Sequence, residues 1–361
     1  MRLQLITAAL LAAMAPAASA RGDNMAEVST RAGAYQDSDR TTIITDNVDA
    51  KGSIGHVGAE ARYLVDVISS ASVDVITAAT GRFHEIRHEA EGGLFYKDDD
   101  RKVSGAYIYS TENDWRSHTG VASFQQDFRH HNGTFKLAGS YVSNAVGRSG
   151  DANFRRHLDV GGGSASLTLV ASPRDLIDVS YSLSYLNGYQ ASPYRFVRFS
   201  DPAGGPLAPS VPETDPNTRL RHAVTLRYNR AVFRDSAVKS HIRGYVDDWG
   251  VTSVTGGAEY VVGFGTFEIA ALVRGYVQKA AVFYQPTYSV PQKYTTADRE
   301  LSTFLDVFAG CRATYRKESM GRLSKLFIEA KFTGYYFRFF DFPRLPERTG
   351  LLAEAALGVS F

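Results

Sequence analysis

Hydrophobic and polar side chains alternate along most of this chain with a period of two. In GHVGAEARYLVDV (55–67), one face carries Val57 and Tyr63, and the opposite face carries Glu60 and Arg62. This period is typical of a β-strand with one apolar and one polar side. No segment of helix length shows a period of 3.6 residues. The alternation recurs in AVTLRYN (223–229), VKSHIRGYV (238–246), TFEIAALVRGYVQ (266–278) and KLFIEAKF (325–332).

The alternation predicts sixteen strands, most of them ten residues long or longer. These strands span residues 27–36, 41–50, 54–67, 87–97, 102–112, 117–128, 133–144, 157–171, 175–188, 218–231, 237–249, 252–263, 266–280, 300–315, 325–338 and 349–361. Strands of ~9–11 residues suit a tilted bilayer crossing, whereas strands of soluble sandwiches and β-helices, the alternative folds, are usually nearer ~5–6 residues. Short connections alternate with long ones such as 189–217. We therefore expect an all-β fold, a transmembrane antiparallel β-barrel of about 16 strands with short periplasmic turns and longer extracellular loops.

The first twenty residues predict a cleaved secretory signal peptide, residues 1–20. A positive Met1-Arg2 end precedes an apolar run, and Ala18-Ser19-Ala20 fits a cleavage site. Residues 21–361 are then expected to form a single barrel domain in the bacterial outer membrane. The mean hydropathy is −0.21, and no later apolar run approaches the ~20 residues of a membrane helix. The single cysteine, Cys311, has no intramolecular disulfide partner.

The chain ends with another alternating segment, LLAEAALGVSF (351–361), whose last residue is Phe361. Such an ending resembles the signal by which outer-membrane barrels are recognised for insertion. We therefore expect the barrel-assembly machinery to bind through Phe361, with outer-membrane lipid and lipopolysaccharide as further partners. A periplasmic partner is expected if the barrel serves an export system. The net charge of only +2 argues against a nucleic-acid partner, and no cofactor is expected.

Residues 84–88, His-Glu-Ile-Arg-His, fit the H-E-x-x-H pattern of zinc peptidases. In those enzymes the motif is helical, so both imidazoles reach one ion. Here the alternation from His88 onward predicts a strand, and Gly92-Gly93 disfavours a long helix. Four residues of strand span ~13 Å, which is too far for one zinc ion. We interpret the motif as coincidental and expect no metal site, although Glu112 lies far enough downstream to be a third ligand.

Several blocks of the sequence resemble a bacterial family called domain of unknown function thirty-five seventy. The blocks are AYQDSDRTTIIT (34–45), YLVDVISSASVDVITAAT (63–80), FHEIRHE (83–89), GYQASPYRFVRF (188–199) and RGYVDDWGV (243–251). The matching positions are Asp66, Ser69, Ala71, Ser72, Asp74, Val75, Glu85, Arg87 and Glu89, whereas Ser70 and Thr80 depart from the family pattern. The resemblance implies an outer-membrane β-barrel and implies no particular reaction or ligand.

The polar face of the predicted strands is expected to line the lumen of the barrel. Its expected charged residues are Glu60, Arg62, Arg219, Arg221, Arg227, Lys239, Arg243, Arg274, Arg312 and Lys331. A basic lumen favours anions, but the alternative is that these charges pair across strands and only fill the interior. Aromatic residues are expected as girdles at the membrane interfaces; the candidates are Tyr35, Tyr63, Tyr107, Tyr109, Tyr185, Tyr228, Tyr335, Phe337 and Phe339.

The connection 68–86 is small and apolar, unlike a solvated outer loop. One hypothesis is that it folds into the mouth, where an ionic constriction would form; the alternative is an ordinary capping loop. The constriction candidates are Asp66, Asp74, Glu85, Arg87 and Glu89. The long connection 189–217 is expected to be an outer lid.

Three classes of function remain open at this stage. The favoured one is a porin-like channel for small or anionic solutes, and the alternative is the outer-membrane exit or scaffold of a periplasmic export or assembly system, with a plugged pore. An outer-membrane enzyme would need a catalytic pair such as Ser240 and His222, and no acid–base constellation supports it.

Overall fold

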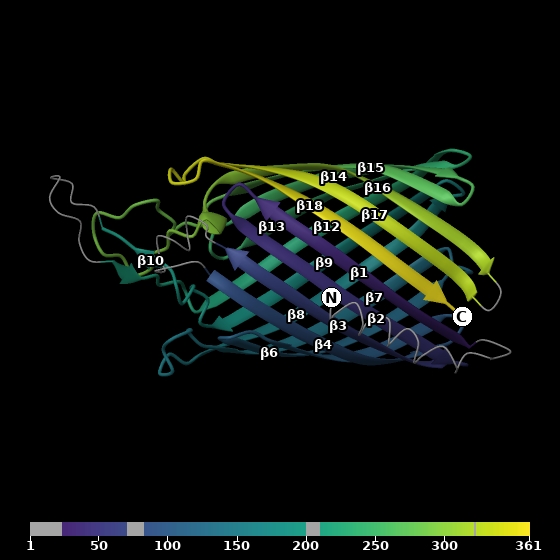
Figure 1. The fold of residues 1–361 in the computed structure, drawn as a ribbon, viewed down its shortest axis with the longest axis horizontal. Helices are drawn as coiled ribbons and strands as arrows, with labels where there is room; N and C mark the ends of the chain where they lie inside the picture. Colours follow the sequence, from purple (N-terminus) through teal and green to yellow (C-terminus); the bar gives the residue numbers. More distant parts are fainter. Residues whose placement is uncertain (1–23, 71–82, 200–209, 321–322) are drawn as a thin grey trace.

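A closed antiparallel β-barrel accounts for most of the computed structural model (Figure 1), which describes residues 24–70, 83–199, 210–320 and 323–361. In these ranges sixteen strands form the barrel, and β1 (Met25–Asp37) pairs with β18 (Glu347–Ser360) to close it. The strands between them are β2 (Thr41–Ile54), β3 (Val57–Ser70), β4 (Phe83–Lys97), β5 (Arg101–Thr111), β6 (Trp115–Phe128), β7 (Gly133–Val146), β8 (Arg156–Ser172), β9 (Asp175–Gly188), β12 (Thr218–Phe233), β13 (Ser236–Asp247), β14 (Thr252–Phe264), β15 (Phe267–Lys279), β16 (Phe304–Met320) and β17 (Leu323–Phe339). The predicted all-β, sixteen-stranded antiparallel barrel is confirmed.

The connections differ between the two ends of the barrel. The end that holds the start of β1 and the end of β18, which we call the turn end, has tight turns such as Gly55-His56 and 173–174. The opposite end, which we call the loop end, carries the long connections 189–217 and 280–303 (left in Figure 1). Tight turns also occur there, at 38–40 and 112–114. Within the described ranges, no helix is long and apolar enough to cross a membrane.

Strand pairing sorts the side chains onto two faces of the barrel. Arg62 lies opposite Asp49 on one neighbouring strand and Glu91 on the other, so one face is charged. The other face is apolar and open, with Leu94 67% exposed and Phe332 61% exposed. A closed barrel satisfies the backbone of every strand within the sheet, which a lipid environment requires. The apolar face is therefore the outer one, and the charged face lines the lumen.

An aromatic cluster lies inside the barrel near the loop end. Register places Tyr35, Tyr335, Phe337 and Phe339 on the inner face, so the expectation of a membrane girdle was wrong for these four. The rings of Tyr335 and Phe337 are stacked with centroids 6.4 Å apart, and Arg348 lies 4.0 Å above the Phe337 ring. Tyr63, Tyr107, Tyr109, Tyr185 and Tyr228 lie on the outer face, as expected.

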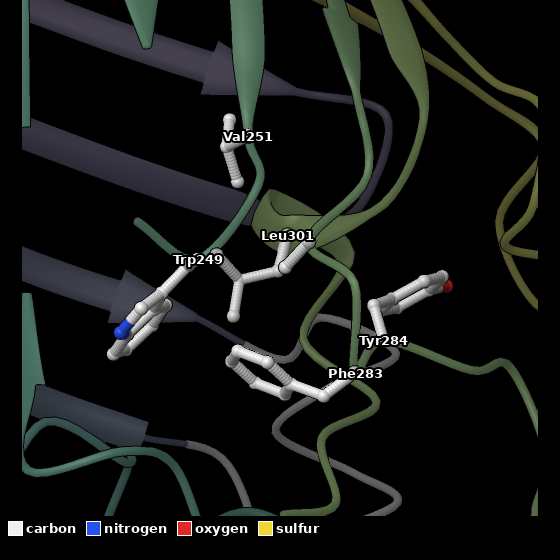
Figure 2. Close-up of a cluster of buried hydrophobic side chains, with 6 residues drawn as sticks. Trp249, Val251, Phe283, Tyr284 and Leu301 are labelled. Carbon is white, nitrogen blue, oxygen red and sulfur yellow. The ribbon is translucent and has the colours of Figure 1, made fainter. Parts of the chain in front are cut away.

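The described parts of connections 189–217 and 280–303 pack together over the loop end, and we call them the cap. A small sheet of β10 (Phe196–Val197) and β11 (Val211–Pro212) and a 3₁₀ turn η1 (Arg299–Leu301) lie within it. Figure 2 shows an apolar cluster beneath the cap, in which Phe283 and Leu301 meet Trp249 from the β13–β14 turn. The rings of Trp249 and Phe283 meet edge to face at 5.1 Å. The cap is thus anchored to the barrel by buried side chains.

Candidate functional site in the lumen

The inner face carries all ten charged residues that were expected to line the lumen. They are Glu60 and Arg62 on β3, Arg219, Arg221 and Arg227 on β12, Lys239 and Arg243 on β13, Arg274 on β15, Arg312 on β16 and Lys331 on β17. The alternation of each strand accounts for this placement, because cross-strand partners share a face.

Most of these charges pair across neighbouring strands. Arg312 contacts three carboxylates, those of Glu259, Glu268 and Glu329. The remaining pairs are Arg62–Glu91 at 2.8 Å, Arg227–Asp178 at 2.7 Å, Arg274–Asp306 at 3.2 Å, Lys331–Glu354 at 2.7 Å and Arg219–Asp247 at 2.5 Å. These basic residues are therefore paired with carboxylates of the barrel wall and are not free cations.

Arg221, Lys239 and Arg243 differ from the others, because none of them forms an ion pair with any residue in the described ranges. The Nε atom of Arg221 is buried and has no hydrogen-bond partner. The guanidinium of Arg243 lies over the ring of Tyr245, 5.6 Å from its centroid. β12 and β13 therefore present three basic side chains without an ion pair in the described ranges, although Arg221 lies opposite Asp247 and Lys239 opposite Glu259 in the register.

A pocket of about 570 Å³ opens on the inner face beside two of these cations, Arg221 and Arg243. The neighbouring part of the wall is formed by small residues of β7, β8 and β9, because GGGSAS (161–166) and SYSLS (180–184) place only Gly or Ser on the inner face. The hydroxyl groups lining it belong to Ser140, Ser164, Ser182 and Ser184. Guanidinium and hydroxyl groups are both hydrogen-bond donors to anions, so the pocket is suited to a small anion.

The turn end of the lumen has the opposite character beneath β1 to β4. A second pocket, of about 350 Å³, is lined by Glu27, Asp49, Glu60 and Glu91 together with Lys51 and Arg62. The acidic groups outnumber the basic ones there. The lumen thus has a side with arginines on β12 and β13 and serines on β7 to β9, and an acidic side at β1 to β4.

The structure pairs two of the constriction candidates with each other and a third with a different residue. Arg87 pairs with Asp66 at 2.9 Å, and Glu89 instead pairs with Arg62 at 3.2 Å. Asp74 lies outside the described residues, as does most of connection 68–86. The ends of the predicted connection were wrong, since β3 extends to Ser70 and β4 begins at Phe83.

Glu85 joins two residues that the strand pattern did not connect with it, Glu112 and Asp114 of the β5–β6 turn. One oxygen from each of these three carboxylates lies within 4.8 Å of the others. Glu112 was considered from the sequence only as a distant zinc ligand, and Asp114 was missed because its position depends on the conformation of the turn.

The H-E-x-x-H segment is extended throughout: the alternation predicted a strand only from residue 87 onward, whereas β4 begins at Phe83. β4 pairs along its length with β3, which puts Glu85 opposite Ile68 on the inner face and His88 opposite Val65 on the outer face. The Nδ1 atom of His88 is 2.9 Å from the Tyr63 hydroxyl. The motif therefore does not present its residues to a single ion as a helix would.

Ser240 and His222 do not form a catalytic pair. The hydroxyl of Ser240 donates to the carbonyl oxygen of Tyr228 at 2.9 Å. Nδ1 of His222 lies 2.8 Å from the hydroxyl of Tyr181 instead.

The cap contains its own buried ionic group. Arg195 contacts Asp298 at 2.7 Å and Glu213 at 3.4 Å. Glu213 also accepts hydrogen bonds from the backbone N–H of Ala297 at 2.8 Å and the hydroxyl of Thr296 at 3.1 Å. Burial raises the pKa of Glu213 to about 7, and this effect outweighs the opposing effect of the Arg195 guanidinium.

A closed sixteen-stranded barrel with an apolar outer face and a polar lumen defines the class of outer-membrane β-barrels. Within that class, the chain belongs to the family described as "Protein of unknown function (DUF3570)", whose model matches residues 77–163 and 155–327. The matched region includes Glu85 to Glu89 and the blocks at 188–199 and 243–251. It begins after the block at 34–45. No curated protein sequence matches the chain.

Solved structures of outer-membrane proteins resemble this chain in fold at low sequence identity. A bacterial polysaccharide outer membrane secretin is 9% identical, with a TM-score of 0.50 over 94% of this chain and 98% of that chain. CdiB from Acinetobacter baumannii is 8% identical, with a TM-score of 0.51 over 95% of this chain and 61% of that chain. The siderophore receptor PirA from Acinetobacter baumannii is 10% identical, with a TM-score of 0.48 over 89% of this chain and 53% of that chain, so this chain spans about half of that receptor.

Proposed function

We propose that the protein is a porin-like channel that conducts small anionic solutes across the outer membrane. The observation that carries the proposal is the pocket of about 570 Å³ on the inner wall, in which Arg221 and Arg243 face serine hydroxyls without carboxylate partners in the described ranges. Charged side chains that line a pore set its ion selectivity. Small inorganic anions and short carboxylates are the solute class that this chemistry fits.

The size of the barrel supports the proposal. Sixteen strands are enough to enclose an aqueous channel when nothing fills the interior. The small inner residues of β8 and β9 leave space on the wall beside the arginines, whereas bulkier side chains would fill it.

The test is single-channel recording in a planar bilayer under a salt gradient, with reversal potentials giving the ratio of anion to cation permeability. The wild-type barrel is expected to favour anions severalfold. Replacing both cations, Arg221→Gln with Arg243→Gln, is expected to bring the ratio to about one while leaving conductance measurable. Arg230→Gln is the matched control, because Arg230 lies on β12 but on the outer face.

Two outcomes contradict the proposal. Cation selectivity in the wild type would show that the acidic side of the lumen dominates. A silent barrel would favour the second candidate, the exit or scaffold of a periplasmic export system. The feature that favours this candidate is the cap, which hydrogen bonds and a buried apolar cluster hold over the loop end.

A further inference from the structure

Three carboxylates converge at the loop end of the barrel on elements that are adjacent in space. Glu85 lies near the start of β4, and Glu112 and Asp114 lie in the turn between β5 and β6. β4 and β5 pair as far as His88 opposite Thr111, so the turn that follows Thr111 lies beside Glu85. One oxygen from each carboxylate is within 4.8 Å of the others.

Because Glu85 is buried, its carboxylate charge needs compensation. Glu85 is only 5% exposed, and its Oε1 atom is buried without a hydrogen-bond partner. The Arg87 guanidinium acts on Glu112, but it is already bound to Asp66 at 2.9 Å. Around Glu85 itself lie the carboxyl groups of Glu112, with which it shares a hydrogen bond, and of Asp114, together with the backbone N–H of Asn113, which donates to it. A buried carboxylate without a cationic partner is costly unless a cation or a proton compensates its charge.

The turn that carries two of the carboxylates is held in place by the backbone. The N–H of Glu112 donates to the carbonyl oxygen of Trp115 at 2.8 Å, and the N–H of Gly147 donates to that of Asp114 at 2.6 Å. The arrangement is therefore preorganised by groups other than the carboxylates. Burial also raises the pKa of Glu112, as expected for acids gathered without enough positive charge.

We propose that Glu85, Glu112 and Asp114 bind a calcium ion. Carboxylate oxygens are the ligands that this hard cation takes, six to eight at about 2.3–2.6 Å, and three carboxylates with water can supply them. No sulfur or imidazole is among the three residues, which disfavours zinc and softer metals. The proposal is independent of solute selectivity, because the cluster lies on β4 and the β5–β6 turn rather than on β12 and β13.

The position of the site indicates what the ion would do. The hydroxyl of Tyr194, in the cap, donates to Asp114, and the N–H of Ser149 donates to the hydroxyl of Tyr194 at 2.6 Å. Calcium at Asp114 would thus connect β4 and the β5–β6 turn to the β7–β8 connection and the cap. Its role would be to brace the loop end.

Terbium luminescence tests the site directly, because Trp115 follows Asp114 in the chain and can transfer energy to a bound Tb³⁺ ion. The purified full-length barrel, in detergent free of lipopolysaccharide, is titrated with Tb³⁺ under tryptophan excitation, and Ca²⁺ is then added in competition. We expect sensitised emission that Ca²⁺ displaces, and at least a tenfold loss of affinity in Glu85→Gln and in Asp114→Asn.

Three controls separate the site from general acidity and misfolding. Glu347→Gln removes another loop-end acid, one that pairs with Arg338, and is expected to bind as the wild type does. Trp115→Phe is expected to lose the emission but keep Ca²⁺ binding by calorimetry, whereas Trp249→Phe keeps both. Each variant is first shown to be folded by its heat-dependent shift in gel mobility.

Wild-type emission that Ca²⁺ does not displace would overturn the proposal, as would folded Glu85→Gln that binds with unchanged affinity. Either result would leave a proton shared between Glu85 and Glu112 as the compensation for the buried charge. A cation-selective or silent pore has no bearing on these readouts, so failure of the channel proposal and failure of this one are distinguishable.

Discussion

Arg219 binds one carboxylate oxygen of Asp247 with two nitrogen atoms, Nε at 2.8 Å and Nη2 at 2.5 Å. The other oxygen of Asp247 accepts the backbone N–H groups of Trp249 and Val251, each at 3.0 Å. The ring of Trp249 lies over the Arg219 guanidinium, 4.2 Å away. Asp247 therefore ties β12, the end of β13 and the base of the cap together.

Asp247→Ala is expected to destabilise the loop end strongly, because it leaves the buried Arg219 guanidinium and two backbone N–H groups without an acceptor. Breaking a buried ion pair in this way costs about 3–5 kcal/mol. The measurement is the unfolding midpoint, followed by heat-dependent gel mobility. Asp248→Ala is the matched control. Asp248 accepts one exposed backbone hydrogen bond from Leu220, and its loss is expected to cost about 1 kcal/mol.

Gly310→Ala is expected to impair folding, because an added Cβ would lie 2.3 Å from the carbonyl oxygen of Phe332 and 3.0 Å from the Thr333 hydroxyl. Overpacking of this kind costs about 1–3 kcal/mol. Gly275→Ala on the neighbouring strand has nothing within 4 Å of the new methyl group and is expected to be neutral or slightly stabilising. Equal unfolding midpoints for the two variants would contradict the close approach of β16 and β17.

The cap is expected to be more stable at pH 5 than at pH 8. Burial raises the pKa values of Glu213 and Asp215 from 4.5 and 3.8 to about 7, so the folded cap holds protons that the unfolded segment releases. Such a contribution is complete below the unfolded pKa values, declines by about 1.4 kcal/mol per pH unit for each group as pH rises from there to the folded pKa, and is lost above about pH 7.

The rate at which protease cleaves the cap gives the measurement. Rates are compared with those of a Glu213→Gln, Asp215→Asn double variant at each pH, so that the pH dependence of the protease cancels. The wild-type cap is expected to become relatively more sensitive as pH rises from 5 to 7, and to change little above that. A ratio that does not change with pH would show that ionised Glu213 is already compensated by Arg195.

Phe361→Ala is expected to lower the amount of assembled barrel in the outer membrane severalfold. The structural contribution of the residue is modest, because its backbone N–H, which donates to the carbonyl oxygen of Ala26 at 2.8 Å, is kept in the variant. The free energy of unfolding of the refolded variant is therefore expected to lie within about 1 kcal/mol of the wild-type value. Leu351→Ala, an outer-face change on the same strand, is the control for both assays. Normal assembly of Phe361→Ala would mean that the barrel-assembly machinery does not recognise this residue.

The barrel could be predicted from the sequence because each strand has one apolar and one polar face. The weakest prediction, 41–50, corresponds to β2, where Asp46 on the outer face interrupts the alternation and receives a hydrogen bond from Thr30. The same alternation indicates the inner face for Phe337 and Phe339, because both lie an even number of residues from Lys331 on β17. The expectation that they form a girdle rested on their being aromatic, whereas their position in the alternation indicates the lumen.

The loop-end contacts could not be predicted in the same way. The contact of Tyr194 with Asp114 joins residues 80 positions apart through connections without periodicity. Likewise, the absence of an ion pair at Arg221 depends on which carboxylates its neighbours have already taken, and Arg219 takes Asp247. Alternation assigns a residue to a face but does not select its partner on that face.

Because β1 pairs with β18, the barrel can close only when β18 is present. Removing β18 would break two ladders at once and expose unpaired backbone along both β1 and β17, in a solvent that offers no replacement hydrogen bonds. Loss of β18 would therefore open the whole barrel, because β18 joins β1 to β17. A chain without β18 would therefore have two unpaired sheet edges, which favour aggregation.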